Sequence, residues 1–287
     1  MKYLKYYISP LTIITAIYTC SIGAYYSTLF FIGFSLFIIL GDMILKKDAS
    51  EETYSYVFLL DVPMYINLPL LMLLVLFTVF ALSSDPSDLF QSIFMNYLNI
   101  DLFNMRQSMN AADSISLVAL TGLFIGIMGT VPGHELVHRK KNKFDMFMGN
   151  WLLAFSWDCA FAIEHVYGHH KNVGLGHDPA TAKRGENIYL FILRAIIKEQ
   201  KDAWSIELNQ AKRREQSFIS IRNRMIIGYF RSLFITFIAY LIGGISGTLI
   251  FLLCAFIAKS LLEVINYSEH YGLIRVSGGT VSPRHSW

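Results

Sequence analysis

Long apolar segments are the feature that most constrains the fold of this chain. A helix that crosses a bilayer needs about 20 mostly apolar residues. Only 16% of the 287 residues are charged and 54% are hydrophobic, whereas soluble domains are roughly 25% charged. The segments of sufficient length lie at residues 7–23, 26–45, 58–82, 113–133, 225–243 and 245–265. We therefore expect an all-α membrane protein with six transmembrane helices, built as a single membrane domain over residues 1–287.

The N-terminal segment has some features of a cleaved signal peptide. Lys2 and Lys5 precede an apolar run at residues 8–20, which is the arrangement of a signal sequence. No small-residue cleavage site followed by a soluble domain comes after it. We therefore expect a retained first membrane helix.

The segment 144–163 is also apolar, but Asp145, Asn150 and Asp158 interrupt it. We expect one or two helices here, buried in protein or lying at the membrane interface. A seventh span would put the histidine-rich segments on its two sides on opposite faces of the membrane. Spans one and two, and spans five and six, are expected to form hairpins, the second turning at Gly243–Gly247.

Lysine and arginine lie almost entirely on one side of the six-span arrangement. That side receives the N-terminus, the loop with Lys46 and Lys47, and the segments 139–143 and 171–224. Of the 24 lysines and arginines, only Arg106 falls on the other side. Because positive residues are retained in the cytoplasm, we expect both termini there. The net charge of +3 is too small to indicate nucleic-acid binding.

The segment 186–216 is predicted to form an amphipathic helix on the basic side. Its first half supplies apolar residues and its second half is strongly charged. Two interpretations stay open: a surface helix lying on the membrane face, and a platform for an acidic electron-transfer partner.

Six of the eight histidines fall into three short clusters, and imidazole is a common ligand of transition metals. His134 and His138 are four residues apart, on one face of a helix, and His165 and His169 repeat that spacing. His170 lies about 100° further around a regular helix, so we expect it to address a second metal or the opposite side of the site. The third cluster contains His270, at the end of the sixth span.

Other classes of protein use some of these features. The pentapeptide His134-Glu-Leu-Val-His138 also matches the zinc metalloprotease motif, with Glu135 as general base. Six histidines on several membrane helices are too many for one zinc, which takes three protein ligands at a catalytic site. A metal transporter usually places its ligands near mid-bilayer, whereas these clusters lie at one edge. The isolated His177 and His285 need no metal.

The chain resembles the membrane-bound fatty-acid desaturase and hydroxylase superfamily, and within it the integral-membrane alkane monooxygenases. The matching strings are His134-Glu-Leu-Val-His138, Glu164-His-Val-Tyr-Gly-His-His170, Asn266-Tyr-Ser-Glu-His-Tyr-Gly-Leu273 and Asp178-Pro-Ala-Thr-Ala-Lys-Arg-Gly-Glu-Asn-Ile-Tyr189. The second and third strings are specific; the first alone is not. The fold implied is a bundle of membrane helices with a cytoplasmic histidine-rich di-iron site.

The resemblance implies terminal hydroxylation of alkanes to 1-alkanols in a bacterial inner membrane. Two non-haem iron ions and the co-substrate O₂ would do the chemistry. Electrons would come from rubredoxin and its NAD(P)H-dependent rubredoxin reductase, and the alkane substrate from lipid. A xylene-type methyl hydroxylase or a desaturase is the alternative. The implied iron ligands are His134, His138, His165, His169, His170 and His270.

Four acidic neighbours are candidates to orient these imidazoles, since metal-bound histidines usually donate their other N–H to a carboxylate or carbonyl. They are Glu135, Glu164, Asp178 and Glu269. Asp178-Pro179 could instead simply make a turn.

The resemblance also implies a further histidine box near the C-terminus, of the type Leu-Gln-Arg-His-Ser-Asp-His-His. This chain ends at Pro283-Arg-His-Ser-Trp287, a string that lies upstream of that box in the family. We therefore expect a C-terminally truncated sequence whose iron site is incomplete and inactive by itself.

Overall fold

A computed structural model describes residues 2–45 and 52–286 of the chain, and all its regular secondary structure within these ranges is helical. The predicted basic loop with Lys46 and Lys47 lies outside the described residues, as does Trp287. The α-helices are Ile8–Ser21 (α1), Tyr26–Ile44 (α2), Phe58–Leu82 (α3), Asp88–Leu98 (α4), Leu102–Ser108 (α5), Ala111–Phe124 (α6), Val131–His138 (α7), Lys143–Ala154 (α8), Phe161–Glu164 (α9), His170–Asn172 (α10), Ile188–Arg213 (α11) and Arg224–His270 (α12). Two 3₁₀ turns, Leu4–Tyr7 (η1) and Pro283–His285 (η4), and two π-helical turns, Ile125–Thr130 (η2) and His165–His169 (η3), complete the elements.

The chain forms two compact units. Unit 1 comprises Met1–Phe124 and Thr236–Cys254, and unit 2 comprises Ile125–Ile235 and Ala255–Trp287. All six clustered histidines belong to unit 2. The predicted single domain over residues 1–287 stays a prediction.

Four helices in the described part of the chain are long and apolar enough to cross a membrane. They are Tyr26–Ile44, Phe58–Leu82, the continuous stretch Ala111–His138 and Arg224–His270. The predicted first span is represented by α1, which has only 14 residues. At 1.5 Å per residue it covers about 21 Å, less than the roughly 30 Å hydrocarbon core. The chain is thus a multi-pass helical membrane protein.

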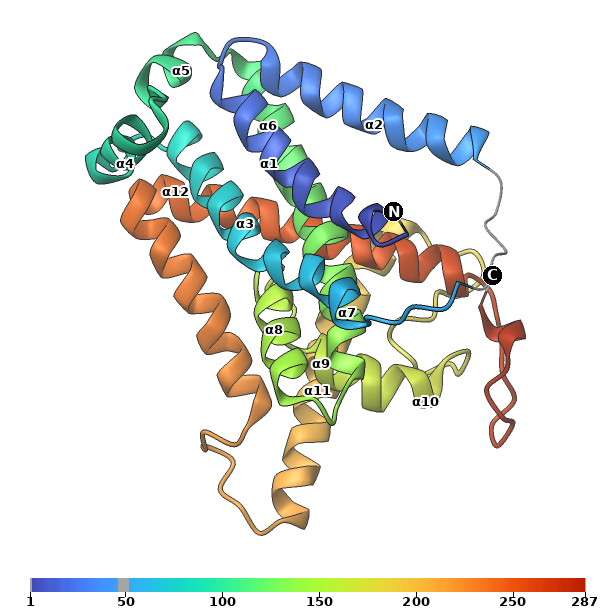
Figure 1. The fold of residues 1–287 in the computed structure, drawn as a ribbon. Coiled ribbons are helices and arrows are strands. Elements are labelled where there is room, and N and C mark those ends of the chain that lie inside the picture. The colour runs from blue at the N-terminus through green and yellow to red at the C-terminus, as the bar shows by residue number, and fades with distance from the viewer. Residues whose placement is uncertain (1, 46–51, 287) are drawn as a thin grey trace. The chain divides into compact units, whose positions relative to one another are not determined.

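The predicted fifth and sixth spans lie together in α12, and the expected turn between them is confirmed. Gly243 and Gly244 leave the helical conformation, and Gly244 adopts φ +57° with ψ −148°, a region open essentially to glycine alone. A Cβ on Gly247 would lie 3.0 Å from the carbonyl oxygen of Ala239, so the limbs before and after the turn approach closely. Figure 1 shows the abrupt change of direction.

Two hydrogen bonds in unit 1 join polar side chains of neighbouring helices. Thr78 and Thr121 join their hydroxyls at 2.7 Å between α3 and α6. The Thr28 hydroxyl donates to Asp113 Oδ1 at 2.7 Å between α2 and α6. Such pairs satisfy groups that cannot find water inside a membrane.

Asparagine caps set the starts of three helices in unit 2. Asn142, Asn187 and Asn223 precede α8, α11 and α12, and each side chain accepts from two backbone N–H groups of the first helical turn. Asparagine is among the preferred N-cap residues because its side-chain oxygen satisfies these exposed donors. The amphipathic helix predicted at residues 186–216 is confirmed as α11.

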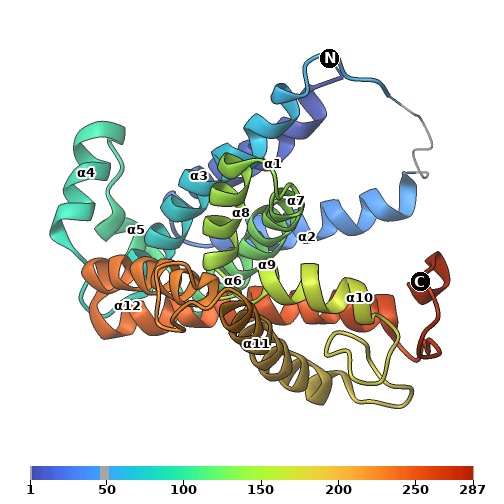
Figure 2. The same cartoon turned by 90° about the horizontal axis from the view of Figure 1, so that it is seen from below.

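The apolar segment 144–163 forms two helices, α8 and α9, as expected, and most of its residues are buried. Helix α7 packs directly on α8, and Figures 1 and 2 both show α7, α8 and α9 side by side. The contact depends on two glycines. A Cβ on Gly133 would lie 3.2 Å from Gly149 O, and one on Gly149 would lie 3.0 Å from Gly133 O. Close packing at this point fixes α7, which carries His134 and His138.

Candidate metal centre

Two helical segments of unit 2 present the first two histidine clusters to each other. His134 and His138 lie on α7, directly after the π-helical turn η2. His165 and His169 begin and end the second π-helical turn, η3, and His170 follows it. Both histidine helices are therefore interrupted by a π turn, a feature found frequently at functional sites.

The π turn changes which histidines share a face. A regular α-helix was expected to separate His170 from His165, but residues 165–169 have about one residue more per turn, and the expectation fails for that reason. The Nε2 atoms of His165 and His170, five positions apart, lie 3.0 Å from each other. His170 thus joins the same group of rings as His165.

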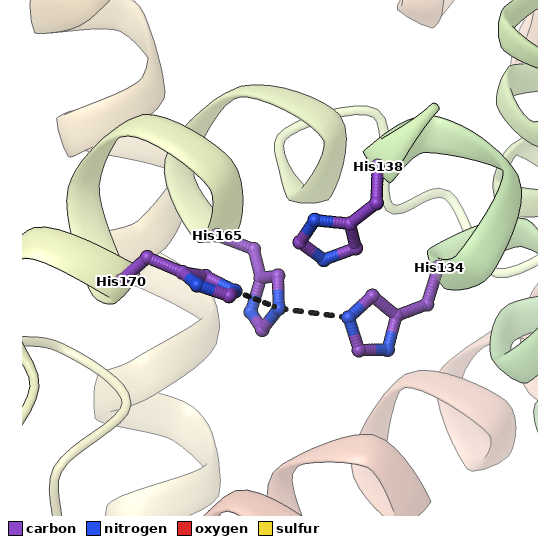
Figure 3. A group of neighbouring side chains, drawn as sticks. All are labelled: His134, His138, His165 and His170. Carbon is purple, nitrogen blue, oxygen red and sulfur yellow. Dashed lines mark hydrogen bonds between the residues drawn. The ribbon is translucent and has the colours of Figure 1, made fainter. Parts of the chain in front are cut away.

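Four imidazoles converge at this point. His134, His138, His165 and His170 each offer a ring nitrogen, and these atoms all lie within 4.8 Å of one another. His165 Nε2 also lies 3.0 Å from His134 Nε2. Figure 3 shows the four rings turned toward a common centre from two separate helical segments.

The ring nitrogens of this cluster fit a transition-metal ion. Each has a single in-plane position, which holds either a proton or a lone pair. His165 Nε2 contacts both His134 Nε2 and His170 Nε2 at 3.0 Å, so at most one of the two contacts is a good hydrogen bond. A cation that accepts the three lone pairs would remove this conflict. Imidazole donors suit iron, zinc and copper alike.

The protonation of His165 agrees with this fit. Burial, together with the neighbouring imidazoles, lowers the pKa of His165 well below its usual value. A ligand histidine must be neutral, so the surroundings hold His165 in the form that binds a metal.

His169 and His270 form a second, adjoining pair. Their ring centroids lie 4.9 Å apart and both side chains are buried. His169 Nδ1 contacts Asp178 Oδ2 at 3.0 Å, and His270 Nδ1 donates to the carbonyl oxygen of His285 at 2.9 Å. In each ring Nε2 is left as the remaining nitrogen. A cavity of about 170 Å³ opens beside the pair.

The four predicted acidic neighbours lie in different surroundings. Asp178 is buried, contacts His169 and accepts a hydrogen bond from the Thr181 hydroxyl at 2.5 Å. Glu269 is half exposed, with its carboxylate 3.8 Å from His270 Nε2. Glu135 is 58% exposed and pairs with Arg139 at 3.1 Å. Their roles toward a metal-bound imidazole stay predictions.

Glu164 directly precedes His165 and is buried. Its Oε1 atom has no hydrogen-bond partner among the described residues, and a Cβ on Gly168 would lie 2.5 Å from that atom. Burial first, and the nearby carboxylate of Asp178 second, raise the pKa of Glu164 to about 8. This residue is therefore neutral at neutral pH.

A buried ionic cluster in unit 2 was not anticipated from the sequence. Lys259 Nζ lies 2.7 Å from Asp158 Oδ2, 2.6 Å from Glu199 Oε2 and 2.7 Å from Glu263 Oε1. All four side chains are at most 6% exposed. The available signal was the pair Lys259 and Glu263, four residues apart inside an apolar segment, where ionisable residues are rare.

Comparison with known proteins identifies a family and several relatives. The sequence model of the fatty acid desaturase family matches residues 114–287. An alkane 1-monooxygenase of Acinetobacter baylyi is 32% identical over 254 residues, which is 86% of this chain and 57% of that protein. Alkane 1-monooxygenase 2 of Alcanivorax borkumensis is 33% identical over 188 residues, 64% of this chain and 49% of that protein.

A third relative is aligned over the whole chain. The xylene/toluene monooxygenase hydroxylase component XylM of Pseudomonas putida is 28% identical over 288 residues, covering 100% of this chain and 72% of that protein. By contrast, the chain spans about half the length of the alkane monooxygenases it matches.

The fold and the site thus define a multi-pass membrane protein with a candidate histidine metal centre. The chain belongs to the fatty acid desaturase family, and the resemblance to its alkane monooxygenase branch is confirmed.

Proposed function

We propose that this chain carries the catalytic part of a membrane monooxygenase that hydroxylates an apolar substrate with O₂. The observation that carries the proposal is the convergence of four imidazole nitrogens within 4.8 Å in unit 2. Relatives named as monooxygenases support an oxidoreductase of this class. We take terminal hydroxylation of alkanes to 1-alkanols as the activity.

The centre is proposed to hold two iron ions, one bound by His134, His138, His165 and His170 and the other involving His169 and His270. Iron held by these rings would supply the redox chemistry by which O₂ inserts one atom into a C–H bond. Asp178 holds the His169 ring through Nδ1 and so keeps Nε2 for a metal. The roles assigned to the six histidines rest on this geometry and on the family resemblance.

The protein's own contribution is orientation and exclusion of water. Phe161 stacks on His165 with centroids 4.3 Å apart and meets the His134 ring edge at 5.2 Å. This aromatic ring fixes two imidazoles and covers them from one side. An apolar substrate is proposed to enter from the lipid between helices.

The proposed topology has six spans in a bacterial inner membrane, with both termini and the histidines on the cytoplasmic side. The turn at Gly243 and Gly244 supports two spans within α12. The distribution of lysine and arginine supports the orientation. Rubredoxin and its NAD(P)H-dependent reductase are proposed as electron donors by family resemblance alone.

A xylene-type methyl hydroxylase is the second candidate. It is favoured by one observation, the alignment of XylM over the whole chain. A desaturase and a metal transporter are further alternatives, which share the histidines but not the oxygenated product.

The test uses whole cells that express the full-length gene that encodes this chain, supplied with octane or xylene under ¹⁸O₂. Labelled 1-octanol supports the proposal, and labelled methylbenzyl alcohol supports the second candidate. A matched strain carrying His165→Ala should form neither. Metal uptake without oxygen consumption would overturn both hydroxylase functions and favour a metal transporter.

A further inference from the structure

The α11–α12 connection forms a basic pocket that the proposed reaction does not use. It lies between the end of α11 and the start of α12 and has a volume of about 240 Å³. Three arginines line it, Arg214, Arg222 and Arg224. In Figure 1 this connection is the light-orange loop that joins the two helices.

Only one acidic residue balances these arginines in the lining of the pocket. Glu207 is buried and accepts from Arg224 Nη2 at 2.6 Å and from Arg224 Nε at 2.9 Å. Three arginines against one glutamate leave the lining with a net charge of +2. Arg214 and Arg222 are exposed, so their guanidinium groups are available to a ligand.

Hydroxyl and aromatic groups complete the lining. Ser220 offers a hydroxyl donor at the wall of the pocket, whereas the Ser217 hydroxyl donates to the Ile219 carbonyl at 3.3 Å. Tyr167 forms another part of the wall, with the Arg224 guanidinium 5.0 Å from its ring centre and Lys140 Nζ 4.2 Å from it. Planar guanidinium groups beside a hydroxyl donor match the oxygens of a phosphate ester.

The loop beside the pocket presents large apolar side chains to the surroundings. Ile219 is 82% exposed and Ile221 is 88% exposed. Phe218 is held against Trp204, with ring centroids 5.2 Å apart, and Asn223 donates to the Phe218 carbonyl at 3.1 Å. The loop is therefore anchored at its base while the two isoleucines project.

The position of the pocket along the chain indicates what covers these isoleucines. Helix α12 is a candidate membrane span and begins at Arg224. The start of a span lies where the lipid headgroups meet the acyl chains. Exposed isoleucines next to arginines at that depth are typical of a segment that contacts lipid. A binding surface for an acidic soluble protein would instead be surrounded by polar residues.

We propose that this pocket binds the phosphate headgroup of an anionic membrane lipid, with Ile219 and Ile221 inserted among the acyl chains beside it. Arg214 and Arg222 bind the phosphate oxygens. Arg224 stays paired with Glu207 and shapes the wall. The site holds the α11–α12 connection at the membrane surface.

The test is native mass spectrometry of the purified chain in detergent, with phosphatidylglycerol and phosphatidylcholine added in equal amounts. The chain should retain one phosphatidylglycerol in preference to phosphatidylcholine. Near an anionic surface each basic residue contributes about fivefold in affinity. The double variant Arg214→Gln/Arg222→Gln should therefore lose at least about fivefold of that preference.

The matched control is Lys212→Gln/Arg213→Gln, which removes the same charge at the end of α11 from side chains that do not line the pocket. It should keep the preference to within about twofold. An equal loss in both variants would mean diffuse charge attraction and would overturn the proposal. Displacement by an equal concentration of inorganic phosphate would reassign the pocket to free phosphate. Absence of any preference for phosphatidylglycerol in the unmodified chain would also overturn it and would favour an acidic protein.

Discussion

Two polar clusters in unit 2, of which only the Lys259 cluster is fully buried, differ in the charges they contain. The Lys259 cluster contains its own counter-ions, because one ammonium group meets three carboxylates within 2.7 Å. The four-histidine cluster contains donors of one kind only, whose nitrogens meet one another. A cluster that contains both a cation and its acidic partners can hold helices together, whereas imidazole nitrogens with unshared lone pairs can bind an added metal ion. The first should matter mainly for stability, and the second mainly for binding.

Removing the ammonium group should produce the largest effect. Lys259→Met leaves Asp158, Glu199 and Glu263 buried without their cation. Breaking a buried ion pair in this way costs about 3–5 kcal/mol, so the purified variant should melt far below the unmodified chain in a detergent unfolding experiment.

The control for this change is Lys198→Met, an exposed lysine on α11. It should unfold at nearly the same temperature as the unmodified chain. If the two variants proved equally stable, the Lys259 cluster would not hold the fold.

Removing the central imidazole should weaken metal binding and leave the fold intact. His165→Ala deletes the ring that contacts both His134 and His170. Iron affinity, measured by metal analysis after dialysis, should fall by more than about 100-fold, since even the partners of ligand histidines contribute about 10- to 100-fold. The metal-free chain should keep its helical content by circular dichroism.

His177→Ala serves as the control, because His177 is exposed and lies outside the converging rings. It should retain iron normally. Equal iron loss in both variants would show that the metal binds elsewhere.

Two of the acidic neighbours, Asp178 and Glu135, should affect iron affinity less than His165 does, and unequally. Asp178→Asn weakens the contact that orients His169, and iron affinity should drop by about 10- to 100-fold. Glu135→Gln, which disturbs only an exposed pair with Arg139, should leave it unchanged. Titration of the metal-free protein with Fe(II) under anaerobic conditions measures both, and equal affinities would remove Asp178 from the site.

The smallest effect should come from neutralising one carboxylate of the Lys259 cluster. Burial, and then the neighbouring Glu263, raise the pKa of Glu199 well above its usual value of 4.5. The folded chain keeps this proton where the unfolded chain releases it. Stability is therefore fully present below pH 4.5 and declines as pH rises toward the folded pKa, by up to about 1.4 kcal/mol per pH unit.

Glu199→Gln should remove part of this slope while changing stability little near pH 5, because the glutamine resembles the protonated acid. Unfolding temperatures measured from pH 5 to pH 8 test this. A slope as steep as that of the unmodified chain would assign the proton to another group.

Local sequence patterns were sufficient for the long helices and for the turn in α12. The predicted span 58–82 coincides with α3, and the predicted turn at Gly243–Gly247 is found at Gly243 and Gly244. Both depend on information held within one segment, namely apolar length and the need for glycine at positive φ.

The arrangement within the Lys259 cluster and the four-histidine cluster was harder to predict because it depends on contacts between segments. No helix was predicted between the spans 58–82 and 113–133, yet this segment contains α4 and α5. Two of the three partners of Lys259 come from α11 and from the turn before α9, so the sequence of its own helix reveals only Glu263. The grouping of His170 with His165 needed a π turn, which the usual helical period does not reveal.

Because of the π turn at His165–His169, the number of residues between the histidines decides which of them share a face of the helix. Such a turn is equivalent to a regular helix that has received one extra residue. Deleting any one residue from 166–168 would restore the ordinary helical period and leave His165 and His170 four residues apart, on one face of a regular helix. A change that turned this segment into a regular helix of unchanged length would place His170 about 140° around the helix from His165, and would therefore disturb the cluster more than the loss of one residue there.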